Sequence, residues 1–150
     1  MNEHHWSKFG VHAIGGLGLI LLLVLIFNYG INSEGDLEDR TWVAEEMNID
    51  GTLTAPKDGV VSYAVFSDGT VTGSAGCNNY NGGYETDGAS ITIGPLVSTL
   101  MFCDGAMDQE TAYLALLGSA DSYEVSGDQL TLSKGDTALI KYTAGTVDAG

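Results

Sequence analysis

Gly73–Asp104, with the sequence GSAGCNNYNGGYETDGASITIGPLVSTLMFCD, carries the most specific information in this 150-residue chain. It contains the only two cysteines, Cys77 and Cys103, with asparagine and glycine concentrated between them. Two cysteines in an otherwise cysteine-free chain can form a disulfide, contribute to a metal site or lie apart as buried thiols. Residues elsewhere in the sequence favour the first of these alternatives.

Neither a metal site nor a reactive thiol suits these two cysteines. A structural zinc site takes four Cys or His ligands, but the three histidines, His4, His5 and His12, all lie in or before an apolar segment near the N-terminus. A reactive thiol needs a base or a cation nearby, and Lys and Arg together number only 5. We therefore predict a Cys77–Cys103 disulfide, provided that this region lies outside the reducing cytoplasm.

The apolar segment Val11–Tyr29 reads VHAIGGLGLILLLVLIFNY and contains no Lys, Arg, Asp or Glu. As a helix it would be about 28 Å long, close to the thickness of the hydrocarbon core of a bilayer. A cleaved signal peptide is the competing interpretation, but Phe27–Ile31 contains no small-residue cleavage site, and no cysteine there can accept a lipid. We therefore predict an uncleaved transmembrane anchor.

Charges on either side of this segment predict its orientation. Lys8 lies before it, whereas Glu34 and Asp36 follow it ahead of the first arginine, Arg40. Positive residues favour the cytoplasmic side of a membrane, so we predict a single-pass inner-membrane protein with a cytoplasmic N-terminus and a periplasmic domain. That compartment is oxidising, as a disulfide requires. The predicted parts are a cytoplasmic head (1–10), a transmembrane helix (11–29), an acidic linker (30–40) and an extracytoplasmic domain (41–150).

The chain is strongly acidic, with 20 Asp and Glu against 5 Lys and Arg and a formal net charge of −15. Such a surface repels phosphates, which excludes nucleic-acid binding as a function class. It also repels anionic lipid headgroups. A basic protein or divalent cations would be attracted to it, although high solubility explains the same charge.

Short alternating segments separated by turn dipeptides predict a mainly β domain with an antiparallel meander. Asp-Gly suits tight hairpins because glycine adopts positive φ freely and aspartate tolerates it. The predicted strands are Val61–Phe66, Thr70–Thr72, Ile91–Ile93, Tyr123–Val125, Leu130–Leu132 and Ala138–Tyr142. The predicted turns are Asp58-Gly59, Asp68-Gly69, Asp87-Gly88, Gly127-Asp128 and Gly135-Asp136.

One segment, Ala106–Ala120, departs from this alternation and reads AMDQETAYLALLGSA. Its acidic residues near the start suit the positive end of a helix dipole. We predict an amphipathic helix that packs on a curled, barrel-like sheet, which gives a mainly β (α+β) fold class besides the transmembrane helix. The residues that recur at helical spacing are Met107, Leu114 and Leu117, and Tyr113, Leu116 and Ala120.

This combination of motifs resembles the META domain, also called the HslJ-like domain. The two cysteine phrases that carry the resemblance are AGCNNYNGGY at Ala75–Tyr84 and STLMFC at Ser98–Cys103. The resemblance covers about Thr41–Tyr142 and implies an antiparallel β-rich domain with a single helix. Many HslJ-like proteins look like cleaved lipoproteins, and this chain departs from them. Further matching segments are the opening Trp42, FSDGTVTG at Phe66–Gly73, DQETAYLALL at Asp108–Leu117, and LTL at Leu130–Leu132.

The polar residues Asn78, Asn79, Tyr80 and Asn81 follow Cys77 in a glycine-flanked segment. We predict a loop that is a candidate for presenting side chains to a partner or ligand. Turn chemistry explains the same residues, because asparagine bonds to its own backbone and tolerates left-handed φ.

Three acidic residues, Asp104, Asp108 and Glu110, are candidate Ca²⁺ ligands by type. The sequence has no D-x-D-x-D-G loop, and interactions at the start of a helix account for these residues. We therefore predict no metal site.

No catalytic constellation is visible in the predicted domain. It contains no histidine, so its Ser and Thr residues have no base to complete a triad. Phosphate-binding and dinucleotide-binding fingerprints are absent, and no pair of carboxylates stands out. We therefore expect a non-catalytic domain that carries no cofactor.

The apolar segment itself indicates partners within the membrane. His12 lies near its predicted cytoplasmic end, where an ionisable residue can contact a pigment, a haem or a polar group, although the headgroup zone accommodates it equally. Gly15, Gly16 and Gly18 form a thin patch that another helix can approach closely, without the G-x-x-x-G spacing.

From these features we predict an accessory subunit of a larger membrane complex, such as a photosynthetic or electron-transfer assembly, with integral-membrane proteins as partners. The resemblance to HslJ implies the alternative, a free-standing, envelope-anchored protein with a role in stress or antibiotic tolerance.

Overall fold

The computed structural model describes residues 37–147, which contain ten strands and one helix. The predicted cytoplasmic head, the transmembrane helix and most of the linker lie outside these residues. Within residues 37–147, no helix combines the length and the apolar composition that crossing a bilayer requires. In chain order the elements are β1 (Thr41–Ile49), β2 (Thr52–Thr54), β3 (Tyr63–Ser67), β4 (Thr70–Ser74), β5 (Asn79–Asp87), β6 (Ser90–Ile93), β7 (Val97–Ser98), α2 (Met107–Ser119), β8 (Ser122–Ser126), β9 (Gln129–Lys134) and β10 (Thr137–Ala144).

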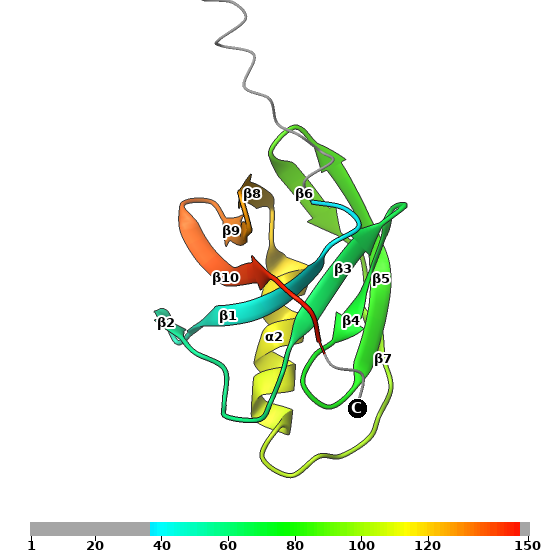
Figure 1. Ribbon diagram of the computed structural model, residues 1–150, viewed down its shortest axis with the longest axis vertical. Coiled ribbons are helices and arrows are strands. Elements are labelled where there is room, and N and C mark those ends of the chain that lie inside the picture. The colour runs from blue at the N-terminus through cyan, green and yellow to red at the C-terminus, as the bar shows by residue number, and fades with distance from the viewer. Residues whose placement is uncertain (1–36, 148–150) are drawn as a thin grey trace, which may run out of the picture. The chain divides into compact units, whose positions relative to one another are not determined.

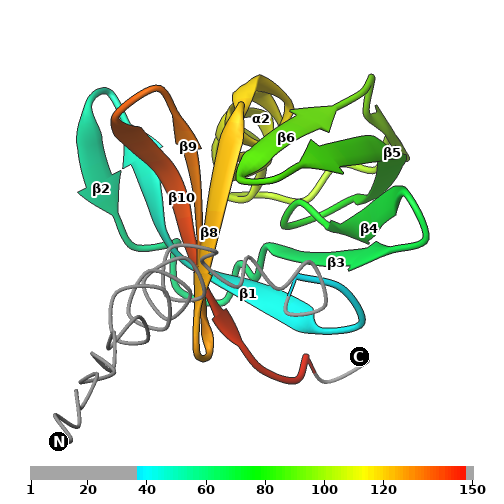
Figure 2. The same cartoon turned by 90° about the horizontal axis from the view of Figure 1, so that it is seen from above.

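Eight of the strands in this part of the chain form a closed antiparallel barrel (Figures 1 and 2). Each strand pairs with the next in the order β1-β3-β4-β5-β6-β8-β9-β10, and β10 pairs with β1 to complete the ring. β2 lies beside β1, and β7 pairs with β5. The helix α2 contacts β1, β6 and β10. The prediction of a mainly β, barrel-like antiparallel domain with one helix is therefore confirmed.

Asp-Gly turns close two of the hairpins. Asp68 and Gly69, with φ of 49° and 75°, join β3 to β4 as predicted. Asp50 and Gly51, with φ of 51° and 85°, join β1 to β2. Positive φ at both central residues is the type I′ geometry that matches the twist of paired strands. β2 escapes prediction from alternation because it has only three residues.

Alternating side chains of the strands fill the barrel interior. Along β3, Ala64 and Phe66 are fully buried, and along β9 Leu130 and Leu132 are fully buried, whereas the residues between them are more exposed. This period of two is the pattern that predicts these strands from the sequence. The same core includes Trp42, Met47, Val71, Tyr113, Leu117, Ile140 and Tyr142.

Four tyrosines form a directed chain of hydrogen bonds inside the core. Tyr80 donates its hydroxyl proton to the carbonyl of Tyr63 at 3.0 Å. A hydroxyl has one proton, so Tyr113 must donate across the 3.0 Å that separates its oxygen from that of Tyr80. Tyr142 in turn donates to Tyr113 at 3.2 Å. A Cβ atom at Gly73 would collide with the Tyr63 carbonyl, so glycine leaves room for the acceptor at the end of the chain.

The first residues that the structure describes, 37–40, already contact the barrel. Leu37 is buried, and its carbonyl accepts a 2.8 Å hydrogen bond from Nε1 of Trp42. Glu38 forms a parallel bridge with Phe66. Residues 37–40, which the predicted linker included, therefore belong to the globular domain.

The seam between β6 and β8 is the thinnest in the ring. Strand pairing there is limited to Ser90 opposite Ser122. Two further backbone hydrogen bonds reinforce the seam, from Ile91 N to Asp121 O at 3.1 Å and from Tyr123 N to Ala89 O at 2.9 Å. β9 and β10, by contrast, pair along most of their length.

The helix α2 matches the predicted range, since Ala106 and Ala120 are its capping residues. The face that it buries includes the predicted Tyr113, Leu117 and Ala120 and extends beyond them at the start of the helix. Its buried residues are Gln109, Glu110, Tyr113 and Leu117, so two polar side chains replace the predicted apolar contacts at the start of the inward stripe. The physical reason is that this end of the helix meets loops whose backbone groups need hydrogen-bond partners.

Candidate functional site around the disulfide

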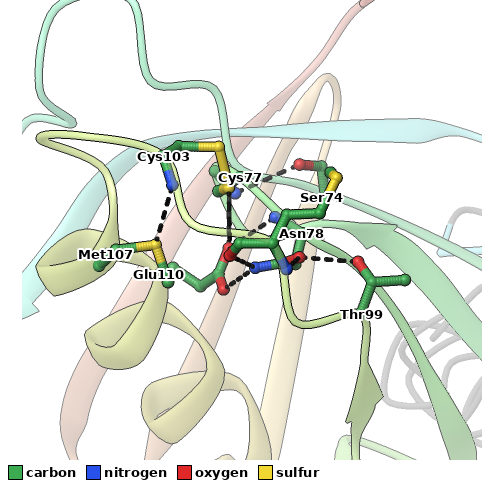
Figure 3. The surroundings of a disulfide bond; sticks show 9 residues. Ser74, Cys77, Asn78, Thr99, Cys103, Met107 and Glu110 are labelled. Carbon is green, nitrogen blue, oxygen red and sulfur yellow. Dashed lines mark hydrogen bonds between the residues drawn. A yellow bond between two sulfur atoms is a disulfide. The ribbon is translucent and has the colours of Figure 1, made fainter.

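Cys77 and Cys103 form a disulfide, which confirms the prediction (Figure 3). Their Cα atoms are 5.7 Å apart, within the usual range for such a bond. Cys77 lies between β4 and β5, and Cys103 lies in the segment that leads from β7 to α2. The bond therefore joins one end of the sheet to the entry of the helix.

Asn78, next to the disulfide, is only 1 % exposed and holds a second segment in place. Its side-chain Oδ1 accepts hydrogen bonds from Oγ1 of Thr99 at 2.8 Å and from the backbone N of Met101 at 2.7 Å. Its Nδ2 donates to the carbonyl of Met101 at 2.9 Å. One buried amide thus fixes the backbone of Met101 through both its donor and its acceptor.

Glu110 completes this arrangement from the helix (Figure 3). It is 5 % exposed. Its Oε2 accepts hydrogen bonds from the backbone N of Cys77 at 3.0 Å and of Asn78 at 2.7 Å. Its Oε1 accepts a hydrogen bond from Nδ2 of Asn78 at 2.7 Å. The carboxylate is solvated by N–H groups in the way that a helix N-terminus solvates an anion.

Gln109 performs the corresponding task for a different loop. Its Oε1 accepts a hydrogen bond from the backbone N of Lys57 at 2.7 Å. Its Nε2 donates to the carbonyl of Val60 at 3.0 Å and to Oγ of Ser62 at 3.2 Å. Two adjacent helix residues therefore fasten two loops to the same end of α2. Among residues 37–147, no buried side-chain nitrogen or oxygen lacks a hydrogen-bond partner.

The segment Asn78–Asn81, predicted as a loop, is largely strand: β5 begins at Asn79. Asn78 and Tyr80 are buried and hydrogen-bonded inside the fold, whereas Asn79 and Asn81 are exposed. The period of two explains this split, because successive side chains of a strand point to opposite faces. Only Asn79 and Asn81 present polar side chains outward.

The three acidic residues considered as Ca²⁺ ligands are not brought together. Glu110 is buried against Cys77 and Asn78, as described above. The side chain of Asp108 is 97 % exposed, and its Oδ2 lies 3.9 Å from Nζ of Lys57. Within the described residues, no group of three or more His, Cys, Asp or Glu side chains could hold a metal ion.

Sequence reasoning missed the exposure of the segment between Thr99 and Cys103. Leu100, Met101 and Phe102 are 96 %, 60 % and 79 % exposed, although all three are large and apolar. The signal available in the sequence was the run Leu-Met-Phe next to a cysteine, but the same run is typical of a buried strand. The predicted membrane residues His12, Gly15, Gly16 and Gly18 lie outside the described residues.

Comparisons with known proteins agree with this architecture. Residues 35–145 match the family model of the META domain. A solution structure of a protein from Burkholderia xenovorans is similar with a TM-score of 0.62 and 24 % identity, and the match covers 98 % of this chain and 100 % of that one. A crystal structure of a DUF4847 family protein from Bacteroides vulgatus has a TM-score of 0.53 and 20 % identity over 77 % of this chain and 99 % of that one. No curated protein matches the sequence.

Proposed function

The chain belongs to the META domain family, and from this premise we propose that it is a non-catalytic binding domain, anchored in the membrane and displayed outside the cytoplasm. The observation that supports a non-catalytic role is the use of the polar residues beside the disulfide. Asn78, Gln109 and Glu110 have the side chains that an active site would need, yet their donors and acceptors hold loops of the same chain.

The disulfide supports the proposed compartment, because such bonds persist outside the cytoplasm and are rare within it. The apolar segment Val11–Tyr29 supports the membrane anchor. The finer part of the proposal is that this HslJ-like domain is an accessory subunit of a larger membrane complex. His12 and the glycine patch in the apolar segment support it, since a simple tether needs neither feature.

The test of location uses the full-length protein in spheroplasts, which are cells that lack the outer membrane but keep an intact inner membrane. A protease added from outside should degrade the domain, and the N-terminal fragment should remain in the membrane after alkaline carbonate washing. Protection of the domain from the protease would contradict the proposed orientation, and release by carbonate would contradict the anchor.

The test of the accessory role is purification from native membranes in mild detergent, followed by native gel electrophoresis. We expect a stoichiometric partner and loss of function when residues 1–29 are replaced by a foreign lipid anchor. A monomer that keeps full function on the foreign anchor would instead favour the free-standing, HslJ-like role in stress or antibiotic tolerance.

A further inference from the structure

An exposed apolar surface lies immediately beside the disulfide. It consists of Leu100, Met101 and Phe102, named here the apolar knuckle. The other large apolar residues that are exposed within residues 37–147 are Val61 and Val97, at 48 % and 64 %. Contiguous exposed apolar surface on a soluble domain is characteristic of interaction sites, because burying it in a partner is favourable. Three consecutive large apolar side chains therefore indicate a contact surface.

The backbone of the apolar knuckle is held on both sides. On its N-terminal side, the backbone N of Thr99 donates to the carbonyl of Asn79 at 3.1 Å. Within the knuckle, the N–H and the carbonyl of Met101 are both hydrogen-bonded to the side chain of Asn78. On its C-terminal side, Cys103 is held by the disulfide and by a contact from its N to Sδ of Met107 at 3.5 Å. A pre-ordered loop loses little conformational entropy on binding, which favours affinity.

Charge indicates the chemistry of the partner. Asp104 follows the knuckle directly, and Asp108, at the start of α2, has Nζ of Lys57 3.9 Å from its Oδ2. The whole chain has a formal net charge of −15. This negative charge opposes an anionic bilayer surface and a second copy of the same chain. It favours a protein surface that carries Lys or Arg.

The segment that carries the knuckle and the start of β1 lie at opposite ends of the barrel. In Figure 1, the segment that leads from β7 into α2 lies at the lower end of the barrel, whereas the chain enters β1 at the upper end.

We propose that Leu100, Met101 and Phe102 form the docking surface for a protein that presents an apolar pocket rimmed by Lys or Arg. This inference rests on the proposed function, since it assigns the surface through which the binding domain contacts its partner. The large side chains of Leu100 and Phe102 act as anchors, and Asp104 faces the cationic rim.

The first test uses full-length protein in native membranes with Phe102→p-benzoylphenylalanine as a photo-crosslinker. The matched control carries the crosslinker at Gln129, an exposed residue at the start of β9. We expect one crosslinked protein from position 102 and none from position 129. Peptide mapping should place the crosslink in an apolar segment with Lys or Arg nearby, and the yield should fall in high salt.

The second test is the double variant Leu100→Ser/Phe102→Ser, with Asn79→Ser/Asn81→Ser as the control on the outer face of β5. We expect at least about tenfold less partner to co-purify with the knuckle variant than with the wild-type protein. Replacing a buried anchor of this kind commonly weakens binding by more than tenfold. The thermal midpoint and the disulfide should be unchanged in both variants, since all four side chains are exposed.

Other outcomes overturn the proposal in distinguishable ways. Crosslinks from position 102 to phospholipid or to a second copy of the chain would show that the knuckle contacts one of these, and would refute the proposed protein partner. A partner that co-purifies equally with the knuckle variant would refute this surface but leave the proposed function intact. Absence of any partner from wild-type membranes would refute both.

Discussion

Glu110 is a buried carboxylate that forms no salt bridge with a cation among residues 37–147. Its two oxygens accept hydrogen bonds from two backbone N–H groups and one side-chain amide. A buried charge is stable only when such groups replace its water. Its role is therefore to hold Cys77 and Asn78 against the helix, and through Asn78 it positions the backbone of Met101.

Removing this carboxylate should destabilise the domain strongly. In Glu110→Ala three donors lose this acceptor, two of them buried, so we expect a loss of about 3 kcal/mol or more in the free energy of unfolding. Asp108→Ala is the matched control two residues earlier in the helix, and it should change the free energy of unfolding by less than about 0.5 kcal/mol because the side chain is exposed. Urea unfolding of both variants measures the difference, and equal values would contradict the assigned role.

The buried tyrosines predict sensitivity to alkaline pH. Burial raises the pKa of Tyr80, Tyr113 and Tyr142 above the ordinary value of 10.0. Below about pH 10 these groups are protonated in both states, so they add no pH dependence. At higher pH they ionise in the unfolded chain alone, and stability falls as pH rises.

Tyr142→Phe tests this expectation, because it removes one of these groups and keeps the ring. The free energy of unfolding of the variant should decline less steeply above pH 10, by up to about 1.4 kcal/mol per pH unit. The variant should also be less stable at pH 7, since it loses the hydrogen bond to Tyr113. Parallel stability curves from pH 9 to 12 would show that Tyr142 ionises equally in both states.

Among the elements, the β6–β8 seam is where the ring should open first. Its backbone bonds are those of Ile91 and Tyr123, on either side of a single residue pair. Local opening occurs where few hydrogen bonds must break together. The long β9–β10 ladder provides the comparison within the same molecule.

Hydrogen exchange should therefore distinguish the two regions. We expect the amide of Ile91 to exchange at least about tenfold faster than that of Leu132 in the middle of β9, because a tenfold rate difference needs only about 1.4 kcal/mol of opening free energy. Amide exchange followed by NMR measures both sites. Equal protection would mean that the barrel opens only as a whole.

Sequence patterns predict the elements well where local chemistry is strong. The turns at Asp68-Gly69 and Gly135-Asp136 lie between predicted strands, because glycine with positive φ closes a tight hairpin in any context. The range of α2 is also predicted. The strand β5 is not, because its start, Asn79–Gly83, is rich in Asn and Gly, which are typical of turns. Pairing of this start with β4 on one side and with β7 on the other overrides that preference.

At the scale of the whole molecule, the disulfide connects regions that the barrel topology places at one end. Cys77 and Cys103 are separated by 26 residues. Closing a loop of this size restricts the unfolded chain by about 3.5 kcal/mol in the entropic model. The same bond also holds the C-terminal side of the apolar knuckle.

The variant Cys77→Ala/Cys103→Ala should therefore lose about 3 kcal/mol of stability and remain folded at 25 °C. Asn78 still holds Met101, so we expect faster amide exchange that is confined to residues 102–105. Denaturant unfolding and exchange together test this. Loss of the whole fold, or exchange that is unchanged near the disulfide, would contradict this account.

Local chemistry in the sequence was enough to determine the β-rich class, the tight turns, the range of the helix and the pairing of the only two cysteines. These features depend on backbone preferences and on residue types that few other structures accommodate. The inward position of Glu110 and the outward position of Leu100–Phe102 were decided only by the tertiary structure. From the sequence alone, an acidic residue in a helix and an apolar run near a strand can each lie in the interior or in solvent. The closed barrel determines which of the two each side chain faces. Closure of the barrel brings Cys77, Asn78 and the start of α2 together, so the backbone N–H groups of Cys77 and Asn78 need the Glu110 carboxylate as an acceptor. The apolar side chains of Leu100–Phe102 remain in solvent.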